Sequence, residues 1–595
     1  MRVPFAVPTN RLSRLALAAL CATGFAGVAI AFTAFAPASA QAQASQTTIR
    51  PTTPRSAPTA PLIAPDSLFP YHPGVDVAHY DFGITLPESG REFQGTATLT
   101  VNRRRTVDTL RLDLKAAMLV DSVLVGTRSR PFRRDAERVH IPLTGADGTH
   151  LTVTVRWHGT PDDGLIITES DKPPAAERGW RAFGDNWPDR ARHWLPTVDH
   201  PSDKATVKWT VIAPSSLAVV ANGTQTAHAS LSSRQGYSAW QFTMRQPIPT
   251  YLMVIGAARM QETALGPTAC GSGIDGACVP QSVWTFPEET SYVPGPFTEA
   301  GRVVQEFAKT ATSFPFERLA HVQSSTRFGG MENATVIFYA DNAFRRHSMG
   351  IGLIAHETAH QWFGNAVSPR RWEDVWLSEG FATYWTALYL RAARSDSAYH
   401  AELRNMRSTV LASKISAERP VVDTVGATSP MRLLNSNSYQ KGGFVLRMLH
   451  GALGDSVFFA GVREYQRRFR HGTATTRELQ HILERHAGRS LEPFFTQWLH
   501  RPGFAELTVK WRYDSTSRTL EATVSQGARF APFALPLVLQ LRDATGATQR
   551  VTLNLQATST QILRMPLHLI GTPVTLDADP DVAILGEIRV EPQTP

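Results

Sequence analysis

The stretch from Ile351 to Leu390 reads IGLIAHETAHQWFGNAVSPRRWEDVWLSEGFATYWTALYL, and the rest of the chain is organised around it. Within it, His356, Glu357 and His360 form a His-Glu-x-x-His sequence, and Glu379 follows after a gap of 18 residues. Residues at i and i+4 of a helix lie on one face, so the two histidines can offer both imidazoles to one metal ion. The glutamate between them can reach a water molecule at that metal.

We expect two helices here, joined by a turn. The first ends at the stop signal Gly364-Asn365. Ser378 is an N-cap candidate for a second helix that runs to about Leu390. This return places Glu379 on the first turn of the second helix, where it can complete a ligand set with the histidines. Two imidazoles and one carboxylate leave a fourth position open for water, which is typical of a catalytic zinc site.

By itself, a His-Glu-x-x-His sequence is also compatible with an ordinary amphipathic helix. However, HETAHQWFGN followed by WLSEGFATYW resembles the aminopeptidase N family of gluzincin metallopeptidases. The resemblance extends upstream to Gly329-Gly330-Met331-Glu332-Asn333, which is similar to the exopeptidase motif of that family. Downstream, Tyr439-Gln440-Lys441-Gly442 is similar to the segment that carries the catalytic tyrosine of the family. The resemblance to the family covers most of the chain, from about Asp76 to Trp498.

The resemblance implies a zinc-dependent aminopeptidase that removes N-terminal residues from peptides. One Zn²⁺ per chain would be held by His356, His360 and Glu379. Glu357 would act as general base on the attacking water, and Tyr439 would donate a hydrogen bond to the developing oxyanion. Without the resemblance, this tyrosine would be interpreted as a packed aromatic residue near a helix start.

The same resemblance implies how the substrate is recognised. Glu332 would pair with the free α-ammonium group of a peptide, and Gly329 and Gly330 would let the backbone run close to the bound chain. The family usually has a glutamine that helps to bind the amino end. Asp185 or Asn186 stands near that place here and could substitute for it.

Two alternatives remain open. One is a family member with another hydrolase activity, such as epoxide opening or an endopeptidase preference. The other is an inactive peptide-binding homologue, which would require the loss of a ligand or of the base, and all of these residues are present.

With 595 residues, the chain is too long for one hydrophobic core. Its patterns predict a multidomain α+β protein. Strand-like alternation dominates residues 71–280, helical periodicity dominates residues 281–504, and strands suited to a small β-sandwich return in residues 505–595. The resemblance implies that the first is a saddle-like β domain and the second a thermolysin-like catalytic domain. We expect no large C-terminal helical domain.

Residues 1–40 are typical of an export signal. Arginines precede an uncharged run from Leu15 to Ala36, and Ala38-Ser39-Ala40 fits the small-x-small cleavage rule. An uncleaved membrane anchor formed by residues 15–36 is the alternative. Residues 41–70 are rich in Gln, Thr, Ala and Pro and predict a disordered linker. We therefore expect a periplasmic or extracellular protein that contacts a membrane only if the signal is not cleaved.

Cys270 and Cys278 are the two cysteines that follow the signal. In an oxidising compartment, such a pair in a glycine-rich loop predicts a local disulfide, whereas a metal site would need more ligands. The formal net charge of +9, from 60 basic and 51 acidic residues, is modest for so large a surface. It does not indicate a nucleic-acid partner. The expected partners are peptides with a free N-terminus.

Overall fold

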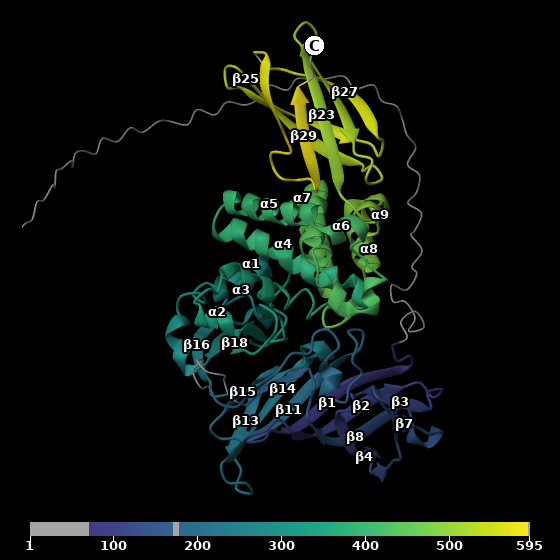
Figure 1. The fold of residues 1–595 in the computed structure, drawn as a ribbon, viewed down its shortest axis with the longest axis vertical. Coiled ribbons are helices and arrows are strands. Elements are labelled where there is room, and N and C mark those ends of the chain that lie inside the picture. The colour runs from purple at the N-terminus through teal and green to yellow at the C-terminus, as the bar shows by residue number, and fades with distance from the viewer. Residues whose placement is uncertain (1–70, 170–177, 570, 593–595) are drawn as a thin grey trace, which may run out of the picture. The chain divides into compact units, whose positions relative to one another are not determined.

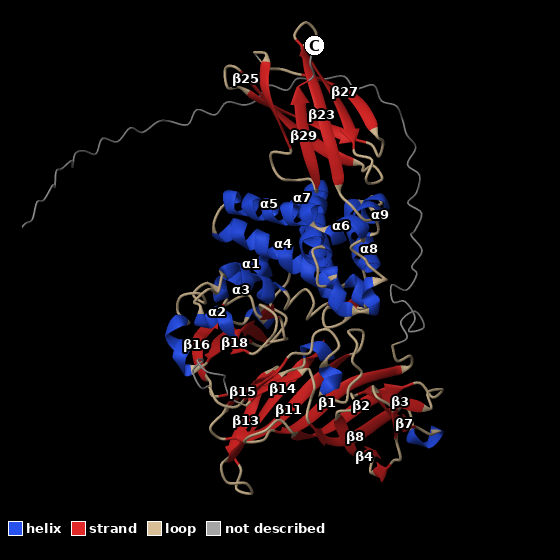
Figure 2. Cartoon of the chain, in the orientation of Figure 1, coloured by secondary structure: helices blue, strands red, loops and turns tan. Residues whose placement is uncertain are grey.

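The computed structural model describes residues 71–169, 178–569 and 571–592. The export signal expected in residues 1–40 and the linker expected in residues 41–70 lie outside the described residues. Strands dominate the first and last parts of the described chain, and the helices lie between them in sequence (Figures 1 and 2). This order agrees with the multidomain α+β fold that the sequence predicts.

The first part of the chain forms a β domain built on three sheets. Their strands alternate between buried and more exposed residues, as in β2, because successive side chains of a strand point to opposite faces. The largest sheet has the order β13-β14-β11-β1-β2-β8-β4-β5. Its strands are β1 (Val75–Thr85), β2 (Phe93–Arg103), β4 (Met118–Val125), β5 (Arg128–Ser129), β8 (His150–Gly159), β11 (Lys204–Pro214), β13 (Thr224–Ser230) and β14 (Tyr237–Pro249). The two smaller sheets contain β3 (Thr109–Asp113), β6 (Arg133–Arg134) and β7 (Arg138–Pro142), and β9 (Leu165–Thr168), β10 (Arg181–Gly184), β12 (Ala218–Ala221) and β15 (Ile255–Ala258).

A five-stranded sheet begins the catalytic domain, with the order β16-β17-β18-β20-β19. Its strands are β16 (Gln261–Thr268), β17 (Val279–Thr285), β18 (Leu319–Ser324), β19 (Gly330–Met331) and β20 (Val336–Ala340). β17 pairs with β18 in parallel, so the hairpin of β16 and β17 belongs to this sheet. The boundary between the N-terminal β domain and the catalytic domain therefore lies near residue 260, between β15 and β16, whereas the sequence patterns predicted it at residue 280. Strand periodicity cannot reveal which sheet a strand will join.

The helices of the catalytic domain carry most of the predicted site, and all but α1, which lies between β17 and β18, follow the sheet in the chain. They are α1 (Ala300–Thr310), α2 (Asp341–Arg345), α3 (Ile351–Ala359), α4 (Trp376–Ala393), α5 (Asp396–Ala412), α6 (Lys414–Glu418), α7 (Gly442–Phe469), α8 (Thr476–Ala487) and α9 (Glu492–Leu499). A π-helical turn, η10 (Asn437–Lys441), leads into α7. Two short strands, β21 (Ser368–Pro369) and β22 (Thr473–Ala474), pair with each other.

The segment from Asn437 to Phe469 is long and apolar enough to cross a membrane by length and composition, and its most apolar window of 18 residues has a mean hydropathy of 1.2. Within the described part of the chain it is the one helix that meets this test, and 44% of its most apolar window is buried inside the protein. Because it carries Tyr439 and packs against α4 and α8, its apolar residues serve the core of the catalytic domain.

The last part of the chain forms two further sheets, ordered β27-β24-β23-β29 and β26-β25-β28. Their strands are β23 (Ala505–Asp514), β24 (Thr519–Gln526), β25 (Leu535–Asp543), β26 (Thr548–Leu555), β27 (Thr560–Pro566), β28 (Pro573–Ala578) and β29 (Gly586–Pro592). Leucines of β25 such as Leu537 and Leu539 are fully buried between them. The strand pairs are antiparallel except for β23 and β29, which pair in parallel, and two layers around one apolar core agree with the small β-sandwich expected in residues 505–595.

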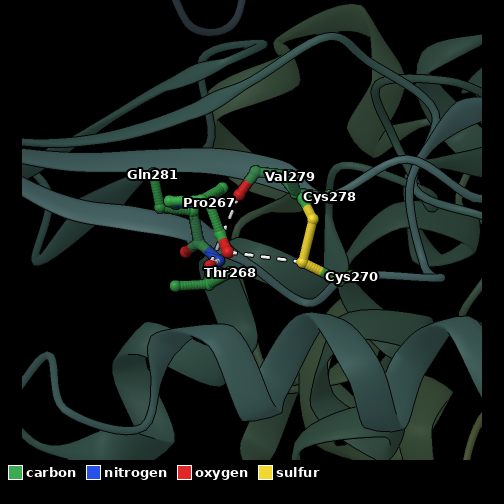
Figure 3. The surroundings of a disulfide bond; sticks show 6 residues. All are labelled: Pro267, Thr268, Cys270, Cys278, Val279 and Gln281. Atoms are coloured by element: carbon green, nitrogen blue, oxygen red, sulfur yellow. Dashed lines mark hydrogen bonds between the residues drawn. A yellow bond between two sulfur atoms is a disulfide. The ribbon is translucent and has the colours of Figure 1, made fainter.

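Cys270 and Cys278 form the predicted disulfide (Figure 3). The bond closes the loop between β16 and β17, beside Thr268 and Gln281, whose side chains are hydrogen-bonded to each other. The loop therefore belongs to the sheet of the catalytic domain and not to the N-terminal β domain, where the sequence placed it.

Candidate metal centre and active site

Helix α3 presents the two predicted histidine ligands together. It ends at Ala359, earlier than the stop signal at Gly364 suggested, so His360 is its C-cap residue. The backbone of His360 nevertheless keeps right-handed helical angles (φ −57°, ψ −25°). Its side chain therefore stays on the face of His356, and the two Nε2 atoms lie 3.1 Å apart.

The third predicted ligand, Glu379, lies on the first turn of α4. Its Oε2 atom is 3.3 Å from Nε2 of His360 and 3.5 Å from Nε2 of His356. In a tetrahedral site with metal–ligand distances of about 2.0–2.1 Å, neighbouring ligand atoms are about 3.3 Å apart. The same Oε2 atom is buried and has no hydrogen-bond partner among the described residues. The three side chains thus fit one zinc ion.

Ser378 has a different place from the one expected. It is not the N-cap of α4, since that position is Val375, and its side chain lies inside the first turn. The hydroxyl of Ser378 is 2.9 Å from Nδ1 of His360, which is also 3.0 Å from the carbonyl oxygen of Phe363. An Nδ1–H that donates to these oxygens leaves Nε2 free to bind the metal. A Cβ atom at Gly364 would lie 2.2 Å from this hydroxyl, so glycine is required there.

Glu357 faces a cavity of about 460 Å³ that the metal ligands also line. Burial raises its pKa well above the usual range for a glutamate, and the neighbouring Glu332 and Glu379 add to this shift while His360 opposes it. A Cβ atom at Gly330 would lie only 2.3 Å from Oε1 of Glu357. The second glycine of the upstream motif therefore leaves room for the carboxylate.

Glu332 follows the edge strand β19 and lies on the wall of the same cavity. It is only 5% exposed, and its Oε1 atom has no hydrogen-bond partner among the described residues. Burial raises its pKa to about 7, with Glu379 adding to the shift and His360 opposing it. A buried carboxylate without a counter-charge is stabilised by any cation that binds beside it.

The rest of the upstream motif divides into two groups. Gly329, Gly330 and Met331 line the cavity with Glu332, whereas Asn333 is buried and is not part of the lining. The structure therefore brings four of the five predicted substrate-binding residues to the site.

Tyr439 projects from the π-helical turn η10 into the cavity. Its ring stacks on that of His356 with the centroids 5.9 Å apart. Burial raises the pKa of Tyr439 well above its usual value, and Glu379 adds to this shift, so the phenol stays protonated and can donate. A Cβ atom at Gly380 would lie 2.9 Å from the backbone of Gly442. Glycine at this position therefore lets the start of α7, which follows the turn η10 that carries Tyr439, pack closely against α4, which carries Glu379.

The side chains of Asp185 and Asn186, which the sequence offered in place of the family glutamine, are bonded inside the protein. The amide of Asn186 donates to the carbonyl oxygen of Met253 at 2.7 Å, inside the N-terminal domain. Asp185 accepts a hydrogen bond of 3.4 Å from the hydroxyl of Thr326, on the loop that leads to β19. Neither residue is among those that line the cavity, whereas the next residue, Trp187, lines it.

The residues that hold the backbone of Glu332 in place were not predicted from the sequence. Its carbonyl oxygen accepts hydrogen bonds from Gln361 Nε2 at 3.0 Å and from Asn365 Nδ2 at 2.6 Å, both just beyond α3. Lys204 of the N-terminal domain in turn donates to the carbonyl oxygens of Asn365 and Ala366 at 2.9 and 3.0 Å. In the sequence, these residues appear only as two amide side chains just after the zinc-ligand motif.

Comparisons with known proteins agree with this geometry. Residues 299–498 match a family model described as the peptidase family M1 domain, and residues 77–252 match the peptidase M1 N-terminal domain. The two matches correspond to the catalytic domain and to the N-terminal β domain described above.

Individual relatives were found among both curated proteins and solved structures. The alanine/arginine aminopeptidase of Saccharomyces cerevisiae is 25% identical over 61% of this chain and 43% of its own length. Probable aminopeptidase 1 of Saccharolobus solfataricus is 26% identical over 78% of this chain and 58% of its own. The chain thus spans about half the length of the curated relatives it matches. The M1 zinc metallopeptidase of Deinococcus radiodurans superposes with a TM-score of 0.62 at 25% identity, over 72% of this chain and 94% of that chain.

Proposed function

Because the chain belongs to peptidase family M1, a family of zinc metallopeptidases, we propose that it is an aminopeptidase that removes single residues from the N-terminus of peptides. The observation that carries this proposal is the buried carboxylate of Glu332, which has an unpartnered oxygen in the cavity beside the metal ligands. A free α-ammonium group supplies the missing counter-charge, and an internal peptide bond does not. The curated relatives named as aminopeptidases support the same conclusion.

Zinc is the metal that suits His356, His360 and Glu379, and when bound it polarises the scissile carbonyl and lowers the pKa of a water molecule toward neutrality. Glu357 accepts a proton from the attacking water at its carboxylate and passes it to the leaving amine. The phenol of Tyr439 donates a hydrogen bond to the oxygen of the substrate carbonyl as negative charge develops there.

Replacing Glu332 with alanine tests the exopeptidase assignment. We expect kcat/KM for peptides with a free α-amine to fall by about ten- to a hundredfold, because a charge-assisted hydrogen bond in a buried site contributes about 1.5–3 kcal/mol. Peptides of the same sequence with an acetylated N-terminus should lose much less. The measurement compares kcat/KM for both series in the wild type and in the variant.

A chelator followed by added Zn²⁺ provides the metal control, which should abolish and then restore activity in both proteins. Equal losses on free and acetylated peptides would mean that Glu332 has a structural role. The exopeptidase proposal would then be given up in favour of an endopeptidase or another hydrolase.

Export is also part of the proposal. It is supported by the signal expected in residues 1–40 and by the disulfide between Cys270 and Cys278, since such bonds persist in oxidising compartments. Cleavage after Ala40 gives a mature protein that begins at Gln41, which N-terminal sequencing of the exported protein would detect. A membrane-bound chain that keeps residues 15–36 would instead support the anchored alternative.

A further inference from the structure

The cavity is lined beyond the metal ligands by residues of both α3 and α4. Glu379, Thr383, Thr386 and Leu390 all line it and recur at helical spacing, so they follow one face of α4. Gly352 at the start of α3 lines the cavity next to this face, because a Cβ atom there would lie in van der Waals contact with Thr386, at 3.9 Å from its side chain. Since a helix rises about 1.5 Å per residue, Thr386 lies about 10 Å along α4 from Glu379.

Glu402 adds a carboxylate to this distant part of the cavity. It lies on α5, which a connection of two residues, Arg394 and Ser395, joins to α4. Helices joined so closely run antiparallel, which brings Glu402 opposite the part of α4 between Thr386 and Leu390. The side chain is half-buried and is hydrogen-bonded to Asn405 on the same helix, but it forms no ion pair with any residue in the described ranges.

The charges around the cavity leave this carboxylate without compensation. Glu332, Glu357, Glu379 and Glu402 contribute four carboxyl groups, and the residues that line the cavity include no lysine or arginine. A divalent metal at the ligand set balances two negative charges, and an α-ammonium group at Glu332 balances a third. The far end of the cavity therefore favours a further positive charge.

The direction of a bound peptide follows from Glu332. Its carboxylate lies within 4.8 Å of ligand atoms of Glu357 and His360, so a peptide held there by its amino end has its first peptide bond at the metal ligands. Beyond that bond, the lining residues Gly352, Thr383 and Thr386 offer the remainder of the peptide a path along α3 and α4. An extended chain advances about 3.3 Å per residue, so a long side chain on the second or third residue reaches a point about 10 Å away.

We propose that Glu402 is a specificity-determining residue that binds a lysine or arginine side chain on the second or third residue of the substrate peptide. The proposal rests on the proposed function, because it takes the amino end of the peptide to be held by Glu332.

The test uses the full chain and short alanine-based peptides that carry one lysine at position one, two or three. Each has a partner peptide with norleucine, which has the same length without the ammonium group. In the wild type, kcat/KM should be about fivefold higher for lysine than for norleucine at position two or three, as expected for a partly exposed ion pair of about 1 kcal/mol. The preference should lie mainly in KM and should weaken at high salt.

Glu402→Gln should remove this preference, chiefly by raising KM for the lysine peptides. Glu402→Lys should reverse it, in favour of glutamate at the same position. The matched control is Glu418→Gln, which removes an exposed carboxylate on α6 that pairs with Lys414 at 3.7 Å, and it should keep the wild-type preference.

An unchanged ratio of lysine to norleucine in Glu402→Gln would overturn the proposal, and so would a preference confined to position one. Equilibrium binding of the same peptides, compared between the wild type and Glu402→Gln, gives a second readout that does not depend on turnover. Failure of the proposed function would give a different result from failure of this proposal. The wild type would then release no N-terminal residue from any peptide, whereas the difference in binding affinity between lysine and norleucine peptides would still measure the effect of Glu402.

Discussion

Replacing Glu357 with glutamine is expected to lower kcat by about two to four orders of magnitude, the usual contribution of a general base. Glutamine has nearly the same shape as glutamate, so it fits the space that Gly330 leaves beside Oε1. Its neutral amide cannot take the proton of the attacking water. The three metal ligands are untouched, and the fold and the zinc content should stay unchanged.

Steady-state kinetics, together with the zinc content per chain, check this expectation. The control is that the variant binds one zinc ion per chain and unfolds at the wild-type temperature. A variant with bound zinc and near wild-type kcat would show that another group removes the proton, and the role of Glu357 would have to be reassigned.

Replacing Tyr439 with phenylalanine is expected to lower kcat by about two to three orders of magnitude, as is found when one oxyanion donor is removed, with little change in KM. The phenol lies in the cavity, and its high pKa keeps the proton available for donation. The phenylalanine ring preserves the stacking on His356, so the local packing should survive.

A matched variant separates catalysis from packing. Tyr384→Phe also removes a buried phenol of the catalytic domain, one that lies 2.7 Å from Nδ1 of His450 and does not line the cavity. It should change thermal stability and leave kcat nearly intact. If Tyr439→Phe behaves in the same way, Tyr439 is a packing residue, which is how the sequence alone would interpret it.

The metal centre could be predicted because its geometry is local. The ligands His356 and His360 are four positions apart on one helix, so helical spacing brings them together, and a short connection to the next helix lets Glu379 pack against them. The family resemblance is confirmed by the matches over residues 77–252 and 299–498. The α+β organisation was predictable too, because strand and helix periodicities are properties of neighbouring residues.

Contacts between distant segments could not be predicted in this way. Ser378 has the sequence position of a helix cap, but the packing of α4 against α3 directs its hydroxyl to His360. Asp185 and Asn186 stand near the place where the family has its glutamine, yet their side chains are hydrogen-bonded to Thr326 and Met253, and Trp187 lines the cavity. Propensity and spacing describe the backbone, whereas the direction of a side chain depends on what packs beside it.

The sequence by itself determined which residues can bind zinc, which carboxylate can act as base, and that β and helical domains alternate along the chain. Only the tertiary structure decided that Glu332 is buried with an unpartnered oxygen, and that Asn365 and Lys204 hold its backbone in place. It also decided that Glu402 of α5 shares the cavity. The physical reason is that the metal ligands lie on two consecutive helices, so their spacing can be read from a short stretch of sequence. Burial and charge balance depend instead on contacts between residues far apart in the chain.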